Sequence, residues 1–351
     1  MNAAASFPSA RVLTIVLNYR TAEMTLRAVA AARKAMQGID GAIIVVDNDS
    51  QDGSFEQMNA HVTAEGWADV TVLAAGRNGG FGAGNNFGIL AGLADPESAP
   101  DFIYVLNSDA FPEPDAIQSL LDHMLAHPQT GFAGSLIYGE DGVEHMTTFR
   151  FPSLAGELEG AMRFGPVSRL LRNHQVPMPP PKHSQPVDWV AGASLMMRVP
   201  MLRDIGLFDE AYFLYFEETD LCLRGQRAGY SIDFVRESRV MHIGSVSTGM
   251  GDWARTPRYW FQSRWYYHVK NHGRLHALCA SVLHLIGGGF HRLRCVLRGR
   301  RSVDPPMFLR DLIRHDAAAL FRPLSAPQIP QLPDVPQGAT PPVPEPARRY
   351  R

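Results

Sequence analysis

Apolar runs of strand length alternate with helical stretches along the first third of the chain. The runs cover residues 12–17, 43–46, 70–73 and 102–106. The helical stretches cover residues 23–36, 55–65, 81–93 and 115–126. Strands that are apolar throughout and alternate with helices are typical of a parallel sheet covered on both faces. The pattern therefore predicts an α/β fold with a mostly parallel central sheet flanked by helices.

The pattern becomes less regular after the last of these helices. Residues 151–186 include a cluster of prolines near 180 and predict an extended insertion or a lid. Regular patterns return at 187–198 and are followed by a helix within 213–229 and strands at 231–235 and 239–242. Glu217 and Glu218 fall in the first turn of that helix, where acidic side chains are favoured.

Polar side chains follow each of the four apolar runs at the point where the predicted strand ends. Ligands of open parallel sheets bind beyond the carboxyl ends of the strands. We therefore expect four groups to converge at one edge of the sheet: Asn18-Tyr19, Asp47-Asn48-Asp49, Arg77-Asn78 and Asn107-Ser108-Asp109.

The composition is that of a folded protein in a reducing compartment. The 351 residues are 45% hydrophobic, and 33 basic against 35 acidic side chains give a net charge of -2, which does not favour nucleic acid as a partner. The three cysteines show no CxxC spacing, so neither a disulfide framework nor a cysteine zinc site is indicated. The first residues lack a basic start followed by an apolar core, so we expect no secretion signal.

The basic residues are unevenly distributed. Residues 253–303 contain ten Arg or Lys and no Asp or Glu, with a cluster of Trp and Tyr and an apolar run at 277–290 that is too short to span a bilayer. This composition is typical of a helix lying on a membrane surface. A basic helical subdomain packed on the main fold explains it equally, so both interpretations stay open. Residues 322–351 are rich in proline and predict a flexible tail.

Several common catalytic motifs are missing where they would be required. The first strand runs into Asn18 without a glycine, so the dinucleotide-binding fingerprint fails, and no Gly-Lys pair exists for a P-loop. Neither Ser194 nor Ser245 lies in a G-x-S-x-G turn. The sequence therefore disfavours NAD-dependent oxidoreductases, P-loop kinases and serine hydrolases.

Five short motifs occur in order along the chain, most of them at predicted strand ends. They are VLNY at 16–19, VVDNDSQDGS at 45–54, RNGGFG at 77–82, LNSD at 106–109, and FDE at 208–210 followed by YFEETDL at 215–221. Each motif is weak alone. Together, over residues 11–248, the chain resembles the inverting glycosyltransferases of family 2, particularly the rhamnosyltransferase-like members. The resemblance implies the GT-A nucleotide-diphospho-sugar transferase fold.

The resemblance also implies a nucleoside diphosphate sugar donor and a divalent cation, Mg²⁺ or Mn²⁺. An oxygen-bound cation neutralises the charge that develops on a leaving diphosphate. Asp109 and His242 are the implied metal ligands, although a strand-end turn residue and a structural histidine are the alternative interpretations. Asn107 replaces the first aspartate of the family's D-x-D motif, and an amide is a poorer ligand than a carboxylate. The residues implied for donor binding are Asn18, Tyr19, Asp47, Asp49, Arg77, Asn107 and Trp189.

Inversion requires one base on the acceptor side. Glu218 is the candidate, and Glu217 and Asp220 lie beside it in the same short motif. Three carboxylates within four residues tend to raise the pKa of one of them, as a base near neutral pH requires. Similar proteins often carry Asp at the position of Glu218, so the choice between Glu217 and Glu218 stays open. Ordinary placement of acids at a helix start is the structural alternative.

We expect three parts: a GT-A domain at 1–252, a basic, aromatic, helical, membrane-proximal extension at 253–321, and the flexible tail at 322–351. The expected function is transfer of a sugar such as rhamnose to a glycan or lipid-linked acceptor in cell-envelope polysaccharide synthesis. We place it in the cytoplasm, peripheral on the inner face of the plasma membrane and in contact through residues 253–303. A non-catalytic nucleotide-sugar or glycan-binding module remains an alternative. A nucleotidyltransferase is disfavoured because the chain has only three lysines.

Overall fold

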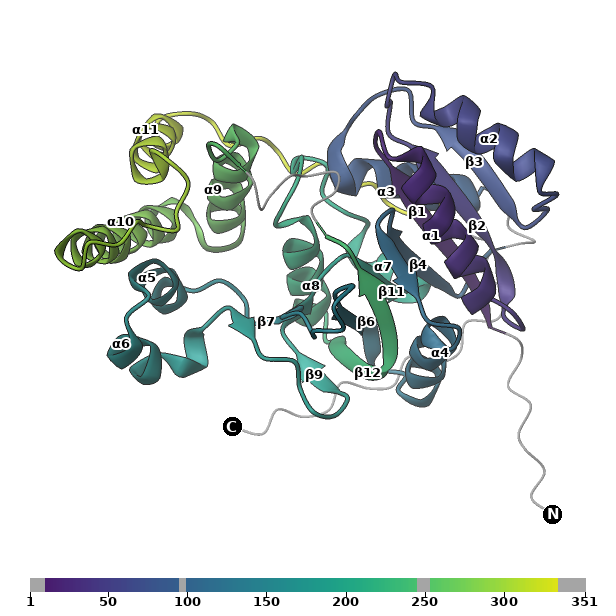
Figure 1. Cartoon of the computed structure of the whole chain (residues 1–351), viewed down its shortest axis with the longest axis horizontal. Coiled ribbons are helices and arrows are strands. Elements are labelled where there is room, and N and C mark those ends of the chain that lie inside the picture. Colours follow the sequence, from purple (N-terminus) through teal and green to yellow (C-terminus); the bar gives the residue numbers. More distant parts are fainter. Residues whose placement is uncertain (1–9, 95–98, 245–252, 334–351) are drawn as a thin grey trace, which may run out of the picture.

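The four apolar runs near the N-terminus form neighbouring parallel strands in a computed structural model that describes residues 10–94, 99–244 and 253–333 (Figure 1). They are β1 (Arg11–Asn18), β2 (Asp40–Asp47), β3 (Val70–Ala74) and β4 (Phe102–Asn107), in the order β3-β2-β1-β4. Asn18 pairs in register with Asp47, so these strands end at the same edge. The predicted α/β fold with a mostly parallel central sheet is confirmed.

The sheet continues beyond β4 in the order β11-β6-β12-β5. The strands are β5 (Ala110–Pro112), β6 (Thr130–Tyr138), β11 (Ser194–Arg198) and β12 (Ser231–His242), and β9 (Gln185–Val187) pairs with β12 at the side. β11 is antiparallel to both of its neighbours, whereas β6 and β12 are parallel to each other. The two strands expected at 231–242 are a single strand with a register shift between Val235 and Arg239.

Alternate residues of the buried strands supply two apolar cores, one on each face of the sheet. Val12 and Val16 pack with α1 (Ala22–Ala35), α2 (Ser54–Ala64) and α4 (Ala116–Ala126). Leu13 and Ile15 pack on the opposite face with α3 (Gly80–Gly92), α7 (Val199–Ile205) and α8 (Glu217–Arg227). The period of two along β1 therefore explains why an uninterrupted apolar run serves both layers.

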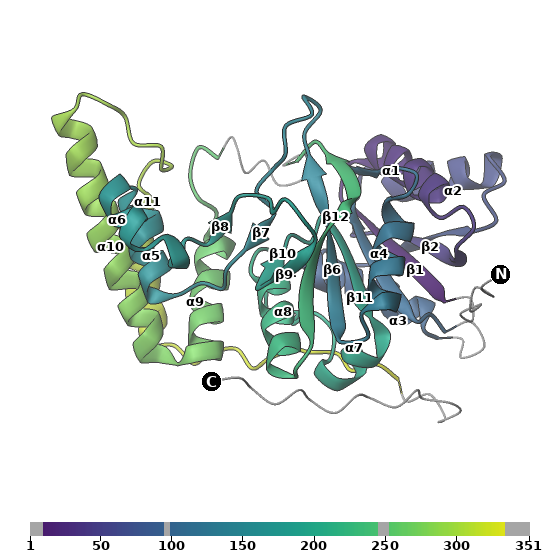
Figure 2. The same ribbon diagram turned by 90° about the horizontal axis from the view of Figure 1, so that it is seen from below.

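A group of helices extends the fold at the end of the molecule away from α2 (Figures 1 and 2). Its helices are α5 (Leu154–Met162), α6 (Gly165–Leu170), α9 (Arg258–His272), α10 (Arg274–Leu297) and α11 (Phe308–Leu320). A Cβ atom on Gly287 would lie 2.8 Å from the carbonyl oxygen of Leu158, so this glycine allows α10 to approach α5 closely. No helix within the described ranges is long and apolar enough to cross a membrane.

Residues 151–186, where an insertion or lid was expected, contain regular elements as well as extended chain. They contain α5, α6 and the short 3₁₀ helix Arg172–His174, and β8 (Pro177–Met178) joins β7 (Thr148–Phe149) and β10 (Trp189–Val190) in a small sheet. The apolar side of α5 packs on α10, which the local proline count could not indicate. This part of the chain therefore belongs to the helical extension.

The proline-rich segment is not a free tail over its described part. The backbone N–H of Leu207 donates to Pro330, the N–H of Glu210 donates to Gln328, and Leu332 is buried against the core. Figure 2 shows the segment running back from α11 toward α7. Residues 322–333 therefore strap the helical extension to the sheet domain, because these backbone groups and Leu332 find partners there. The remainder of the expected tail, 334–351, lies outside the described residues.

Candidate active site

A cavity of about 580 Å³ opens at the carboxyl ends of β1 and β4. The first turns of α3 and α8 and the end of β12 complete its walls. This is the edge at which parallel α/β sheets bind ligands, and the volume falls within the range of about 300–1,000 Å³ that is typical of ligand pockets. Its polar and aromatic lining includes Tyr19, Asn48, Asn78, Asn107, Ser108, Asp109, Tyr215, Glu217, Glu218, His242 and Tyr259.

Asp109, His242 and Asn107 meet at one end of this cavity. Asp109 lies in the turn between β4 and β5, and β12 pairs with β5 so that His242 is opposite Ala110. His242 Nε2 is 3.1 Å from Asp109 Oδ1 and 3.4 Å from Asn107 Nδ2. The pairing of β12 with β5 therefore brings together side chains that are 133 positions apart in the sequence.

These side chains fit a hard divalent cation only as part of a larger set of ligands. One carboxylate, one imidazole and one amide oxygen are donors that Mn²⁺ or Mg²⁺ accepts, and Mg²⁺ usually keeps waters or phosphate oxygens as well. Among the described residues, no three His, Cys, Asp or Glu side chains are grouped so that they could hold a metal by themselves. A cation bound here would therefore take further ligands from a diphosphate or from water.

Glu217 and Glu218 line the other side of the same cavity, in the first turn of α8. Glu217 is 2% exposed, and within the described part of the chain its Oε2 has no hydrogen-bond partner. Burial and the neighbouring Glu218 carboxylate raise the pKa of Glu217 well above its usual range. Burial also raises the pKa of Glu218, although backbone N–H groups oppose the shift. The pair therefore resists carrying two negative charges at once.

The backbone that leads into these carboxylates is strained. Tyr215 and Phe216 both have positive φ angles, 69° and 70°, which bulky side chains rarely adopt. Tyr215 packs against Trp253 and Tyr259, and Phe216 packs against Trp260 and Tyr267. Aromatic side chains in and just before α9 therefore hold the bend that directs Glu217 and Glu218 into the cavity.

The structure does not bring Asp220 into this cavity. Asp220 is fully buried, and its Oδ2 is 2.7 Å from Lys270 Nζ on α9 and 3.0 Å from Arg224 Nε. Its Oδ1 accepts a hydrogen bond from Asn271 Nδ2 at 3.0 Å. These partners use the carboxylate to join α8 to α9.

Among the residues expected to bind the donor near β1 and β2, Tyr19 lines the cavity, whereas Asn18, Asp47 and Asp49 do not. Asn18 Nδ2 donates to Asp47 Oδ1 at 2.7 Å, and both side chains are buried. Asp49 accepts from Gln51 at 3.0 Å outside the cavity lining. The hydrogen bond between Asn18 and Asp47 joins the ends of β1 and β2, and the N–H of Ser50 donates to Asp47, which holds the loop after β2.

Asn48 and Asn78 were expected at this edge of the sheet but not as donor-binding residues, and they line the cavity. Asn48 Nδ2 donates to Asn78 Oδ1 at 3.1 Å, and the N–H of Gly80 donates to the same oxygen. Gly80 has φ +88°, and a Cβ atom there would overlap the carbonyl of Phe213. Asn48 directly follows Asp47, and Asn78 directly follows Arg77, which were both expected to bind the donor. Their position beside these residues was the available signal in the sequence.

Arg77 and Trp189 also lie outside this cavity. Arg77 is exposed, and its Nη2 is 2.8 Å from Glu210 Oε2. Trp189 stacks on Phe149, with ring centroids 4.0 Å apart, and donates from Nε1 to the carbonyl of Arg150. Trp189 lines a separate, smaller cavity that adjoins the first at Glu218.

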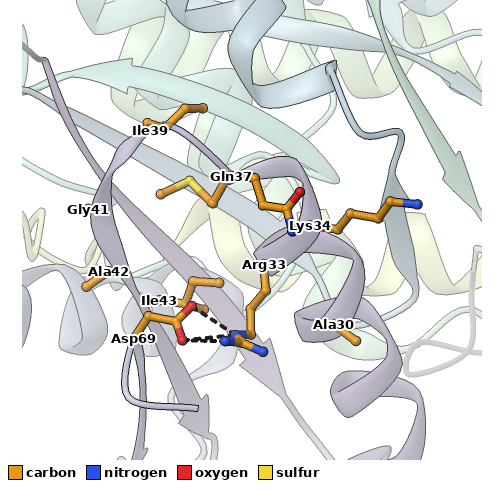
Figure 3. A pocket seen from close by; sticks show the side chains of 10 residues that line it. Ala30, Arg33, Lys34, Gln37, Ile39, Gly41, Ala42, Ile43 and Asp69 are labelled. Carbon is orange, nitrogen blue, oxygen red and sulfur yellow. Dashed lines mark hydrogen bonds and ion pairs between the residues drawn. The ribbon is translucent and has the colours of Figure 1, made fainter.

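Another hollow, of about 480 Å³, lies between α1 and β2 at the opposite edge of the sheet (Figure 3). Arg33 Nη2 is 2.7 Å from Asp69 Oδ1 across it. It lies beside the residues that begin β2, such as Gly41 and Ala42, and so at the amino ends of the parallel strands. Parallel α/β sheets bind their ligands at the carboxyl ends of the strands, so this hollow is not the expected site.

The sequence matches two overlapping protein families. Residues 12–182 match the family described as Glycosyl transferase family 2, and residues 102–304 match Glycosyl transferase family group 2. The second match covers more than half of the chain. It includes all of α9 and α10 but ends before α11, so most of the helical extension is part of the family pattern.

Curated relatives are similar over much of the chain. An N-acetylglucosaminyl-diphospho-decaprenol L-rhamnosyltransferase of Mycobacterium tuberculosis is 30% identical over 218 residues, which are 59% of this chain and 68% of the relative. A pre-mycofactocin glycosyltransferase of the same species is 28% identical over 311 residues, 84% of this chain and 58% of that protein. The similarity to the rhamnosyltransferase extends over more than two thirds of that protein.

A solved structure shares the fold. A mannosyltransferase from Pyrobaculum calidifontis in complex with GDP-Man and Mn²⁺ superposes with a TM-score of 0.52 at 13% identity, and the match covers 89% of this chain and 81% of that one. At this identity the likeness concerns the arrangement of the elements. It agrees with the GT-A layout of a mostly parallel sheet between helices.

Proposed function

The chain belongs to glycosyl transferase family 2 and transfers a sugar from a nucleotide sugar, and we propose that it is an inverting, cation-dependent enzyme that extends a lipid-linked glycan. The observation that carries the proposal is that Asp109 and His242 line the same cavity as Glu218. Donor activation and acceptor deprotonation both need a place in one cavity, on opposite sides of the reacting carbon. Rhamnose is the proposed sugar, because a relative is named as a rhamnosyltransferase.

The donor diphosphate would lie at the Asp109 end of the cavity. Asp109 and His242, with the amide of Asn107, would hold a Mg²⁺ or Mn²⁺ ion there. Such an ion, when bound, stabilises negative charge on the leaving diphosphate. Tyr19, Asn48 and Asn78 would contact the nucleotide at the ends of β1, β2 and the loop before α3.

Glu218 is the proposed base. Its carboxylate would accept the proton of an acceptor hydroxyl while that oxygen bonds to the anomeric carbon and the bond to the diphosphate breaks, with its electron pair leaving on the diphosphate. Attack opposite the leaving group inverts the configuration. The geometry favours Glu218 over Glu217 as the base, because Glu218 also faces the smaller cavity. Asp220, with both oxygens bonded to other side chains, would position α8.

The exposed side of α10 supports the proposed contact with a membrane surface. Large apolar side chains recur there every three or four residues over the whole helix, and they are Leu275, Leu278, Val282, Ile286, Phe290, Leu293, Val296 and Leu297. We call this face the α10 stripe. A helix of 24 residues is about 36 Å long, so the stripe is much larger than the single exposed side chains of ordinary surfaces.

The charges beside the α10 stripe favour an anionic lipid surface. Arg298, Arg300 and Arg301 are exposed just beyond its last turn. Other cations of residues 253–303 bind inside the protein: Arg264 pairs with Glu157 at 3.0 Å and Lys270 pairs with Asp209 at 2.7 Å. Both interpretations left open by the sequence therefore apply to parts of residues 253–303. Some of the basic side chains pack within the protein, and others are exposed at the end of the α10 stripe. The proposed location is peripheral, on the cytoplasmic face of the plasma membrane.

Turnover of a donor panel tests the proposed function. Purified full-length protein is incubated with dTDP-rhamnose and other nucleotide sugars, Mg²⁺ or Mn²⁺, and a synthetic N-acetylglucosaminyl diphospho-lipid with a short chain. Release of nucleoside diphosphate and a product of inverted configuration are expected. Binding of nucleotide without release across the panel would instead identify a non-catalytic binding module.

A further inference from the structure

A second cavity adjoins the proposed donor cavity at Glu218. It has a volume of about 260 Å³ and lies between α5, α8 and α9, with the inner side of α10 at one end. Tyr215 and Glu218 line both cavities, so the proposed base faces each of them. The volume is below the range of about 300–1,000 Å³ that suits drug-sized ligands, and a single sugar ring is smaller than these.

Fixed aromatic rings form much of the wall of this second cavity. Trp189 is held by stacking on Phe149 and by its hydrogen bond of 3.0 Å to the carbonyl of Arg150. Trp260 packs edge to face on Phe261 and Phe308. Rings that are already fixed lose little conformational freedom on binding a flat apolar surface, such as the C–H face of a pyranose.

The polar end of the cavity is formed by Glu157 and His284. Burial would raise the pKa of Glu157, but Arg264, His268 and His284 hold it well below its usual range, so the carboxylate stays charged. His284 Nδ1 is 2.7 Å from Glu157 Oε2. A carboxylate at this nitrogen fixes a proton there and orients the ring, which leaves the other ring nitrogen of His284 to hydrogen-bond a ligand.

We infer that the second cavity binds the acceptor sugar, with Trp189 and Trp260 against the faces of one ring, His284 hydrogen-bonded to it, and the reactive hydroxyl at Glu218. The inference rests on the proposed function. It assigns the acceptor to a cavity built by the helical extension, on the far side of Glu218 from Asp109.

The position of His284 also specifies how the acceptor is presented. His284 is on the inner side of α10, whereas Val282 and Ile286, two positions away on either side, are exposed in the α10 stripe. The acceptor cavity is thus separated from the proposed lipid-facing surface by one helix. A sugar carried on a membrane lipid can therefore reach Glu218 while its lipid stays in the bilayer.

Two substitutions change the lining of the second cavity and leave the lining of the donor cavity unaltered. His284→Leu removes the imidazole that would hydrogen-bond the sugar. Gly160→Leu adds a side chain at the cavity wall, where a Cβ atom would meet no atom within 4 Å. His61→Leu on α2 and Gly165→Leu on α6, which also has open space around its Cβ, are matched controls.

The measurements are steady-state kinetics and direct binding with the short-chain diphospho-lipid probe. We expect the KM for the probe to rise about tenfold in both cavity variants, a change typical of one lost hydrogen bond or a partly filled site. The dissociation constant for the nucleotide, and donor hydrolysis without the probe, should stay within about twofold of the unaltered protein. Probe binding should also change the fluorescence of Trp189 and Trp260, and Trp189→Phe should reduce that change.

An unchanged KM for the probe in both cavity variants, with turnover intact, would overturn the inference. So would an unaltered protein that hydrolyses the donor but neither binds nor glycosylates the probe. A protein that neither binds nor hydrolyses any donor gives a different result, because it contradicts the proposed function itself. Glycosylation of a lipid-free N-acetylglucosaminyl diphosphate with the same KM would support the second cavity as the acceptor site and contradict a role for the lipid in presenting the acceptor.

Discussion

Glu217 and Glu218 are adjacent in the first turn of α8, yet only Glu218 faces both cavities. Glu217 is almost completely buried, and its pKa is raised well above the usual range by burial and by its neighbour. Since a protonated glutamic acid and a glutamine have nearly the same shape and charge, the two positions should respond differently to the same substitution.

We predict that Glu218→Gln abolishes turnover and that Glu217→Gln preserves most of it. Loss of a general base costs about 10²–10⁴ in rate. Glu217→Gln keeps the shape of a side chain that does not face the smaller cavity, and it should lower kcat by less than about fivefold, close to the cost of a minor change in hydrogen bonding. Release of nucleoside diphosphate measures both. Equal losses at the two positions would contradict the assignment of Glu218 as the base.

The raised pKa of Glu217 predicts a stability that falls with pH. A carboxyl whose pKa is higher in the folded state than in the unfolded chain, where it is about 4.3, stabilises the fold most at low pH. That contribution is lost as the pH rises from about 4.3 to the folded pKa, at about 1.4 kcal/mol for each unit between the two values. Glu217→Gln should therefore be more stable than the unaltered protein at neutral pH, and equally stable near pH 4. Urea denaturation across this range measures the difference.

The two ion pairs that Lys270 forms with Asp209 and Asp220 predict that replacing Lys270 strongly destabilises the fold. Lys270 Nζ is 2.7 Å from both carboxylates, which are fully buried. Lys270→Met removes the ammonium group from both carboxylates, although Asp220 keeps its pair with Arg224, and should cost about 3–5 kcal/mol. Arg33→Ala, which breaks the exposed pair with Asp69, should cost about 1 kcal/mol or less. Despite burial, Lys270 lowers the pKa of Asp209, so its stabilisation is present above about pH 4 and fades below it. The difference between variant and wild type should shrink on acidification.

Removal of the cation should weaken donor binding. Nucleoside diphosphate should bind at least about tenfold more tightly with Mn²⁺ than with a chelator, since the cation bridges the diphosphate to the protein. Asp109→Asn should remove most of this difference in calorimetry. Asp233→Asn is the matched control, because Asp233 pairs with His123 at 2.8 Å and lies outside the cavity lining. A Mn²⁺ effect of unchanged size in Asp109→Asn would contradict the proposed ligand.

The α10 stripe predicts binding to anionic vesicles. Each large apolar side chain transferred from water contributes about 1.5–3 kcal/mol, so Ile286→Glu with Leu293→Glu should lower partitioning by at least about tenfold. Val143→Glu, at another exposed apolar residue, should not. Co-sedimentation with vesicles of phosphatidylglycerol measures this. Equal partitioning of the three proteins would exclude the stripe, and a dimer that dissociates in the double variant would assign it to a second copy of the chain.

The parallel half of the sheet was predictable because each of its strands is an unbroken apolar run. β6 was missed, although it is central, because its sequence TGFAGSLIY contains two glycines and a serine. A Cβ atom on Gly134 would lie 2.6 Å from the side chain of Val190, so the glycine is needed for packing that the local sequence does not reveal.

The strand-end rule predicted the cavity but not which side chains enter it. Asn107 and Asp109 do, whereas Asn18 and Asp47 turn toward each other. Trp189 was expected at the donor sugar, and it lines the second cavity instead. That cavity could not be foreseen, because α5 and α10 form it together although more than 100 residues separate them in the chain.

The strap at residues 328–332 connects the far end of the helical extension back to the loop before α8. Since α9 is joined to α8 by Lys270, the extension is held at two places and cannot swing about a single linker. The height of the Glu218 carboxylate above any surface on which α10 rests is therefore constant. If α10 rests on a membrane as proposed, Glu218 would reach acceptor hydroxyl groups at one distance from that membrane.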